Sequence, residues 1–165
     1  MTNRIQIDID HIKEHVNYNR DTGVLTWRKN FFKTKVDSEV GSVSNLGYRK
    51  FGLSGTTYLS HRVVWAIHYS EQPPEIIDHI NGNRLDNRIA NLRSSDHTEN
   101  AENQRKAMRS NKTSKYLGVS KFKGRWRARI KARGKYIFLG YHETEEQARD
   151  AYLDAKRRLH AGCEI

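Results

Sequence analysis

The polar stretch from Ser110 to Ser114 is the feature that most constrains how this chain can fold. It contains no large apolar side chain, and it lies between two segments that carry regular apolar patterns. Only 36% of the 165 residues are apolar, which is too few for one large core and favours two small ones. We therefore expect a first domain over residues 1–107, a linker over 108–115 and a second domain over 116–165.

The charge of the chain is strongly positive and unevenly distributed. The chain has 30 lysines and arginines against 19 aspartates and glutamates, a formal net charge of +11. From Arg109 onward there are 15 basic and 6 acidic residues, a net charge of +9 in the last third. Such asymmetry predicts a polyanionic partner for the second domain, in preference to a basic protein without a specific partner.

Several classes of protein do not fit the sequence. No apolar run approaches the ~20 residues that span a bilayer, and the N-terminus lacks the pattern of a secretion signal. The single cysteine, Cys163, excludes an internal disulfide and a cysteine-rich zinc ribbon. We expect a cytoplasmic protein with no membrane partner, located in the host cell cytoplasm if the gene belongs to a phage.

The first domain is predicted to mix strands and helices. Short strands and a hairpin at Ser54-Gly55 follow a short helix over residues 11–16. A helix capped by Ser60 is predicted to run through His68 and to be stopped by Pro73-Pro74. A strand over 76–80, a turn-rich loop and a return strand over 91–93 come next, and Asp96 and Glu99 are placed to cap a helix to about residue 107.

Asp78, His79 and Asn100 form the candidate catalytic group. Hard divalent cations prefer oxygen ligands, which Asp78 and Asn100 can supply. A neutral imidazole such as that of His79 can take a proton from an attacking water near pH 7. Together they predict metal-assisted cleavage of a phosphodiester bond.

The local geometry requires an irregular strand end. Adjacent strand residues point to opposite faces, so Asp78 and His79 can serve one site only if the strand ends or twists there, which Asn81-Gly82 permits. Asn91 could then bond to the backbone near His79 and fix the imidazole. The alternative is that these residues have only a structural role, as ordinary turn and capping residues.

Three further histidines lie near this region. His61, His68 and His97 are expected to be structural or to face DNA. His97 is the alternative metal ligand if the helix begins differently from the prediction.

The order and spacing of these motifs resemble the phage-type HNH endonucleases, some of which are homing endonucleases. The resemblance covers about residues 20–107 and is carried by residues 61–65, 78–83, 86–93 and Asn100. It implies a ββα-metal nuclease fold and products with 5′-phosphate and 3′-hydroxyl ends. It also implies His79 as the general base, Asn91 as the residue that orients it, and Asp78 and Asn100 as ligands of Mg²⁺, with Mn²⁺ as an alternative. Many HNH enzymes have a histidine where Asn100 stands, and the asparagine fits the oxygen-rich, Mg²⁺-using branch.

The second domain is predicted to be a three-stranded antiparallel sheet packed on one helix, which makes the whole chain α+β. The strands are expected over 116–120, 125–132 and 136–141, and Thr144 with Gln147 forms a capping box for the helix. The apolar helix face comprises Ala148, Ala151, Tyr152, Ala155 and Leu159.

Basic residues alternate through the first two strands of this sheet. The candidate DNA-binding residues are Lys121, Lys123, Arg125, Arg127, Arg129, Lys131 and Arg133. Alternation puts the basic residues of 125–131 on one face, and Trp126, Ala128 and Ile130 on the face toward the helix. A sheet with one cationic face can lie in a DNA groove, whereas the alternative is a solvated basic surface.

This pattern resembles the plant APETALA/ethylene-response-factor DNA-binding domain, which is also found appended to phage HNH enzymes. The resemblance covers about residues 114–162 and is carried by residues 116–120, 124–130, 138–144, Ala148, Ala151 and Tyr152. It implies a sheet that enters the major groove of double-stranded DNA, with arginine–guanine contacts. Plant members have arginines where Leu117 and Ser120 stand, so their base preference does not transfer.

The sequence therefore favours a metal-dependent DNA endonuclease whose second domain helps to choose the site. A non-catalytic, sequence-specific DNA-binding regulator is the alternative, and a structural nucleic-acid-packing protein a third. Nicking or double-strand cleavage, a monomer or a homodimer, and homing, restriction or host-DNA degradation all stay open.

Overall fold

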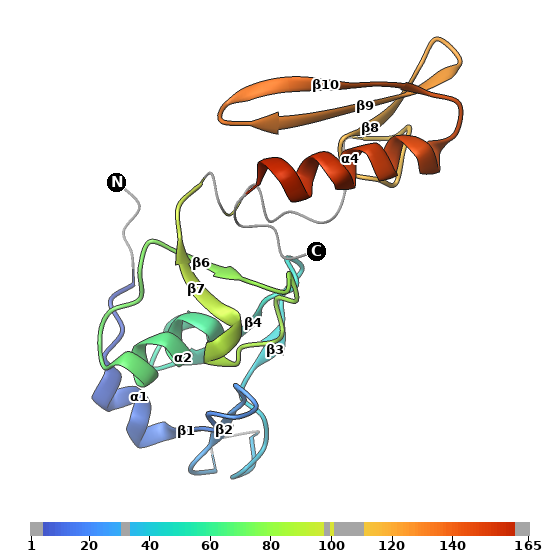
Figure 1. Ribbon diagram of the computed structural model, residues 1–165. Coiled ribbons are helices and arrows are strands. Elements are labelled where there is room, and N and C mark those ends of the chain that lie inside the picture. The colour runs from blue at the N-terminus through green and yellow to red at the C-terminus, as the bar shows by residue number, and fades with distance from the viewer. Residues whose placement is uncertain (1–4, 31–33, 98–99, 101–110, 161–165) are drawn as a thin grey trace. The chain divides into compact units, whose positions relative to one another are not determined.

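The computed structural model describes residues 5–30, 34–97, 100 and 111–160. The chain divides into two compact units, Met1–Ser95 and Asp96–Ile165, each of which combines helix with antiparallel sheet (Figure 1). The architecture is compatible with the predicted α+β class. The domain boundary predicted at residue 107 and the linker over 108–115 stay predictions.

The first unit begins with a short helix and a two-stranded sheet. Helix α1 (Ile9–His15) is capped by Asp8, whose side chain accepts a hydrogen bond from the backbone N–H of His11. Strand β1 (Val16–Tyr18) pairs antiparallel with β2 (Leu25–Trp27). The fully buried Ile12 fixes α1 to the core of this unit.

A three-stranded sheet and a longer helix follow. The strands are β3 (Ser42–Val43), β4 (Arg49–Leu53) and β5 (Thr56–Leu59), in that spatial order. The predicted hairpin at Ser54-Gly55 is confirmed, since β4 and β5 pair across it. Helix α2 (Ser60–Tyr69) packs on β4 and β5, and its residues Val63, Val64 and Ala66 have no exposed surface.

The predicted helix is confirmed through His68, but its predicted cap at Ser60 is wrong and it ends before it reaches Pro73-Pro74. The N-cap is Leu59, which makes no side-chain cap bond, and the hydroxyl of Ser60 is buried without a hydrogen-bond partner. Ser60 already has helical backbone geometry, so it cannot cap the helix that it belongs to. The helix ends at Tyr69, before the prolines, because Ser70 adopts a left-handed conformation with φ of 55°.

The end of the first unit is a hairpin with a long, turn-rich connection. Strand β6 (Ile76–His79) pairs antiparallel with β7 (Leu92–Ser95), and a 3₁₀ turn, η1 (Ile89–Asn91), precedes β7. The return strand therefore starts one residue later than predicted. Asn91 lies in η1, where its side chain bonds to the loop instead of joining the strand.

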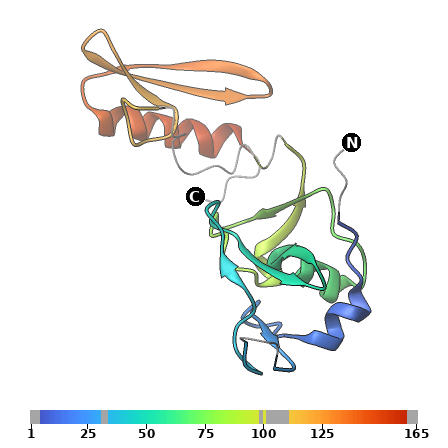
Figure 2. The ribbon, with the colours of Figure 1, turned by 180° about the vertical axis from the view of Figure 1, so that it is seen from behind.

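Over residues 111–160, the second unit has a three-stranded antiparallel sheet with a helix along a single face (Figures 1 and 2). The sheet has the order β10-β9-β8 and consists of β8 (Val119–Phe122), β9 (Arg125–Ala132) and β10 (Lys135–His142). Helix α4 (Glu145–Leu159) begins with the predicted capping box of Thr144 and Gln147, which is confirmed. The predicted sheet-on-helix arrangement is also confirmed.

The first strand of this sheet starts three residues later than predicted. Gly118 has φ of +72°, and a Cβ there would lie 2.2 Å from the ring of Tyr152. The chain therefore turns at Gly118 and passes closely over α4 before it can extend.

The apolar face of α4 packs on β9 as predicted, except at its last turn. Ala148, Tyr152 and Ala155 are buried, and Ala151 packs beside them. Leu159, the last residue of the predicted apolar face, is 41% exposed, whereas Lys156 is buried. The packed face therefore turns toward Lys156 where the helix ends.

Among the described residues, no helix has both the length and the apolarity that crossing a membrane requires.

Candidate nuclease site and nucleic-acid interface

Asp78 and His79 end strand β6, and both side chains are buried. Asp78 lies opposite Arg93 of β7, whose Nη2 and Nε donate to Oδ2 of Asp78 over 2.8 and 3.1 Å. Two donors on one oxygen fix the rotation of the carboxylate. Arg93 thus orients the acid that the sequence predicts as a metal ligand.

The imidazole of His79 is held by a residue that sequence reasoning missed. Nε2 of His79 lies 3.2 Å from Oδ1 of Asn87, and both residues are buried. An amide oxygen can only accept, so this contact places the proton on Nε2 and the lone pair on Nδ1. Asn87 follows Asp86 in a turn-like stretch, and only its burial distinguishes it from an ordinary turn asparagine.

The environment of His79 favours the neutral imidazole. Burial lowers the pKa of His79 below its usual value, whereas the Asn87 hydrogen bond and the charges of Asp78 and Asp86 act in the opposite direction. Burial outweighs these effects. A neutral imidazole near pH 7 is the form that can accept a proton from water.

Asn91 ties the two sides of the loop that follows His79. Its Oδ1 accepts from the backbone N–H of Asn81 over 2.9 Å, and its Nδ2 donates to the carbonyl of Asp86 over 2.8 Å. The sequence predicted a bond from Asn91 to backbone near His79, and the Asn81 contact confirms it. No described contact joins Asn91 directly to the imidazole, so its orienting effect on His79 passes through the loop and stays a prediction.

The same loop is fixed from two further sides. Arg88 donates to both carboxylate oxygens of Asp86 over 2.8 and 2.6 Å, which lowers the pKa of Asp86 to about 2. On the other side, Gly23 in the β1–β2 turn approaches so closely that a Cβ there would lie 2.2 Å from the backbone nitrogen of Arg88. The residues around His79 are therefore held by packing as well as by hydrogen bonds.

A second histidine packs against the first. His61 of α2 is buried, and its ring meets that of His79 edge-on with centroids 5.2 Å apart. Burial and the neighbouring His79 lower the pKa of His61 to about 3. Tyr48 contacts both rings, and the Arg84 guanidinium covers Tyr48 at 4.8 Å. His61 is thus structural, as expected, but it forms part of the wall of the site.

The other residues that the sequence suggested for this site have fewer described contacts with Asp78 and His79. Asn100 is exposed and helical, and its N–H donates to the carbonyl of Asp96 over 3.0 Å. It belongs to the second unit, so its approach to Asp78 stays a prediction. His97 is exposed, His68 contacts Tyr18 and Tyr69, and the predicted capping residue Glu99 lies outside the described residues.

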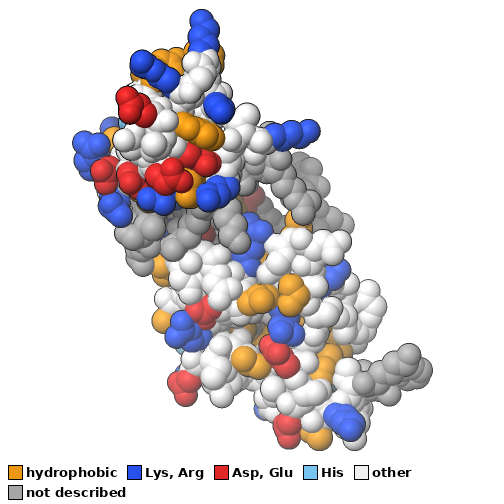
Figure 3. Space-filling model, turned by 90° about the vertical axis from the view of Figure 1, so that its right-hand side faces the viewer, with side chains coloured by type: hydrophobic (Ala, Val, Ile, Leu, Met, Phe, Trp, Pro, Cys, Tyr) orange, Lys and Arg blue, Asp and Glu red, His pale blue; other side chains and the backbone are white. Residues whose placement is uncertain are grey.

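Strand β9 carries the predicted cationic face. Arg125, Arg129 and Lys131 are exposed and Arg127 is half-buried, whereas Ala128 and Ile130 are buried beneath them. The predicted alternation is confirmed. Figure 3 shows basic and acidic side chains interspersed on the face of the molecule that it presents.

The other predicted basic residues lie around this face. Lys123 and Arg133 occupy the two turns, with φ of 45° and 49°. Lys121 pairs with Trp126 across the strands and lies over its ring, on the side of the sheet that faces α4. Their contacts with DNA stay predictions.

Exposed aromatic side chains share the cationic face, which the basic pattern alone did not suggest. Cross-strand pairing puts them on the side away from α4; they are Phe122, Tyr136, Phe138 and Tyr141. Phe122 stacks on Tyr141, and the guanidinium of Arg129 lies 4.9 Å from the centre of the Tyr136 ring. Apolar exposure of this extent is uncommon away from binding surfaces.

No curated protein and no solved structure matches the chain. One family model matches part of it, and that part contains Asp78, His79, Asn87, Asn91 and Asn100. HNH nucleases typically use a divalent metal. Residues 58–102 match the family described as HNH endonuclease, and this match supports a nuclease that acts on DNA.

Proposed function

We propose that this protein is a metal-dependent DNA endonuclease that hydrolyses phosphodiester bonds. The observation that carries the proposal is the buried His79, held through Nε2 by Asn87 beside the oriented carboxylate of Asp78. These residues all lie in the segment that matches HNH endonucleases. A buried, neutral and oriented imidazole next to an acid is what a general base in hydrolysis requires.

In this proposal His79 acts through Nδ1. The nitrogen takes a proton from the attacking water, while Asn87 keeps the ring in one tautomer and orientation. The buried side chain of Asn91 joins the two sides of the largely exposed loop after His79 and so helps to hold the ring in place. Such fixed geometry lowers the reorganisation required at the moment of reaction.

Asp78 and Asn100 would hold the divalent cation, Mg²⁺ or Mn²⁺. Their carboxylate and amide oxygens are the donor types that these hard cations prefer. When bound, the cation supplies charge neutralisation at the phosphate and at the leaving oxygen. Arg93, which donates to Asp78, keeps the carboxylate in a fixed orientation for that role.

We propose further that the second unit is a DNA-binding domain similar to the APETALA/ethylene-response-factor domain. Its support is the face of β9, where Arg125, Arg127, Arg129 and Lys131 lie side by side with exposed aromatic rings. The arginines can reach phosphates and guanine edges in the major groove of double-stranded DNA. The aromatic side chains add apolar contacts with bases, such as thymine methyl groups.

Incubation of the protein with supercoiled plasmid tests the activity. With Mg²⁺ we expect nicked or linear products whose ends carry 5′-phosphate and 3′-hydroxyl groups, and no cleavage with EDTA. Mapping the ends on both strands then separates nicking from double-strand cleavage. If the protein binds DNA but leaves plasmids of many sequences supercoiled with Mg²⁺ and with Mn²⁺, it is a non-catalytic regulator instead.

A further inference from the structure

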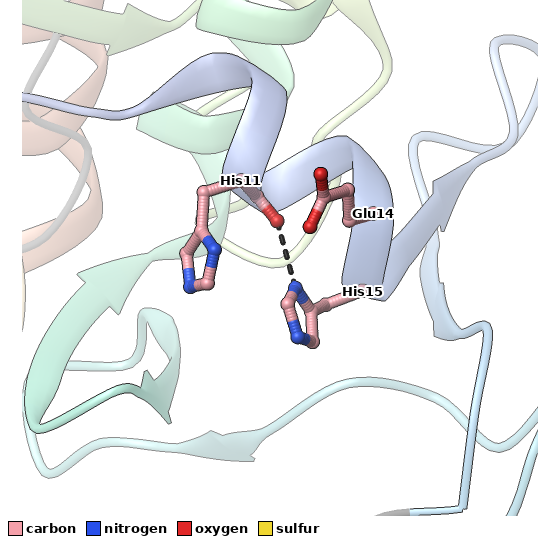
Figure 4. Close-up of side chains that lie close together, drawn as sticks. All are labelled: His11, Glu14 and His15. Atoms are coloured by element: carbon pink, nitrogen blue, oxygen red, sulfur yellow. Dashed lines mark hydrogen bonds between the residues drawn. The ribbon is translucent and has the colours of Figure 1, made fainter.

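Helix α1 carries three side chains of types that can ligate a metal ion, and the proposed nuclease site does not use them. His11, Glu14 and His15 each offer a ligand atom, and these atoms lie within 4.8 Å of one another. The two imidazoles lie side by side, tilted to each other and one helical turn apart, with the Glu14 carboxylate nearby (Figure 4). Residues three and four positions apart share one helix face, which explains the convergence.

The tautomer of His15 is suited to metal binding. Nδ1 of His15 lies 2.8 Å from the backbone carbonyl of His11. A carbonyl oxygen only accepts, so Nδ1 carries the proton and the lone pair is on Nε2. Metal-binding histidines commonly donate their other ring nitrogen to a carbonyl in this way.

The ring of His11 is anchored from the opposite side. Its Nε2 lies 2.9 Å from the hydroxyl of Ser54, in the turn between β4 and β5. When Nε2 donates to that hydroxyl, Nδ1 of His11 carries the lone pair. The centroids of the His11 and His15 rings are 4.5 Å apart, so both rings are held within reach of one cation.

The size and chemistry of the group favour a transition metal. Ligand atoms of a tetrahedral zinc ion lie roughly 3.3 Å apart, given Zn–N distances of about 2.0–2.1 Å. The three atoms lie within 4.8 Å of one another, and the exposed side chain of Glu14 can rotate toward the two rings while His15 keeps its bond to the His11 carbonyl. Two imidazoles and a carboxylate suit Zn²⁺ better than Mg²⁺, which prefers an all-oxygen shell.

We propose that His11, Glu14 and His15 bind one Zn²⁺ ion, separately from the Mg²⁺ site of the nuclease. Three protein ligands leave a fourth position for water. The ion would link successive turns of a helix of only seven residues, which is too short to be stable alone. Because α1 contributes the buried Ile12 to the core, zinc should stabilise the whole first unit.

Calorimetric titration of the full-length, EDTA-treated protein with ZnCl₂ tests the site. We expect one zinc bound per chain, at least a tenfold loss of affinity in Glu14→Gln, and a loss of that binding event in the His11→Gln/His15→Gln double variant. Asp10→Asn removes another exposed carboxylate from the same helix and should bind zinc as the wild type does. Titration with MgCl₂ should give the same heat in the wild type and in all of these variants, because Mg²⁺ does not bind to His11, Glu14 and His15.

Two further measurements keep the test decisive. Thermal unfolding should shift to higher temperature with Zn²⁺ in the wild type and in Asp10→Asn, but much less in Glu14→Gln, whose exposed side chain is not needed for folding. With Co²⁺, the wild type should show the visible absorption of a tetrahedral site. Glu14→Gln and the His11→Gln/His15→Gln variant should not show it. Equal zinc affinity in the wild type, Glu14→Gln and the double variant would overturn the proposal. None of these measurements depends on DNA cleavage, so they test the zinc site independently of the proposed nuclease function.

Discussion

Asn87 and Asn91 are two buried asparagines with different tasks. Asn87 contacts the imidazole of His79, whereas Asn91 satisfies the backbone of Asn81 and Asp86. We expect Asn91→Ala to lower the free energy of unfolding by about 1–3 kcal/mol, because it leaves partly buried backbone groups without partners. Urea denaturation measures this. Asn83→Ala, in the exposed part of the same loop, is the control and should lose much less.

Asn87→Ala should instead slow cleavage while DNA affinity stays close to that of the wild type. The imidazole loses the contact that sets its tautomer, so fewer molecules present the lone pair of Nδ1. A single-turnover rate measured beside a binding isotherm separates the two effects. A variant that binds DNA poorly but cleaves bound DNA at the normal rate would contradict this role.

The lowered pKa of His61 predicts how the free energy of unfolding depends on pH. Its pKa is about 3 in the folded protein and about 6.5 when unfolded, because burial penalises the charged ring. The unfolded chain therefore binds a proton first as the pH falls. The stabilisation is complete above pH 6.5 and is lost progressively as the pH falls from 6.5 toward 3.

The free energy of unfolding, measured by urea denaturation at several pH values, checks this dependence. His61→Gln should show a shallower loss below pH 6.5, since glutamine does not titrate. Identical slopes for the wild type and the variant would mean that other groups dominate the acid sensitivity.

At the scale of elements, patterns that depend on local chemistry could be predicted from the sequence. The alternation of β9 follows from the period of a strand, and the Thr144–Gln147 capping box depends on residues three apart. The start of β8 could not be predicted, because Gly118 turns where Tyr152, distant in sequence, leaves no room for a side chain. Ser60 was misassigned as a cap because a serine just inside a helix and one just before it look alike in sequence.

The face of β9 gives a prediction at this same scale. Arg129→Ala should weaken DNA binding and reduce the log–log salt slope by about 0.9 if the guanidinium contacts a phosphate. Arg157→Ala removes an exposed arginine from α4, on the other side of the sheet, where it pairs with Asp154. That control should leave both quantities near wild type. Binding isotherms at several salt concentrations decide between them, and equal slopes for the two variants would contradict the assignment.

At the scale of the whole molecule, the sequence predicted two small cores, and the structure has two compact units. It also predicted the Asp78–His79 pair at a strand end, but not the contacts that orient them. Arg93 and Asn87 reach these residues through strand pairing and loop closure, and nothing in the local spacing marks either of them.

If the first unit cleaves DNA and the second unit binds it, removal of the second unit should weaken DNA binding. A chain that ends at Ser110 lacks most of the positive charge of the second unit and the whole face of β9. We expect it to bind DNA more weakly, with a flatter salt dependence of about 0.9 per lost phosphate contact. Binding measured across a range of salt concentrations checks this, and an equal slope for the short and full-length chains would contradict it.

The proposal that His79 is the base of a metal-dependent nuclease is tested most directly by His79→Ala. The measurement is the single-turnover cleavage rate with saturating Mg²⁺, taken beside the dissociation constant for the same DNA. Removal of the base should slow cleavage by roughly 10²–10⁴-fold and leave DNA affinity nearly unchanged. Cleavage by His79→Ala at the rate of the wild-type protein would contradict it.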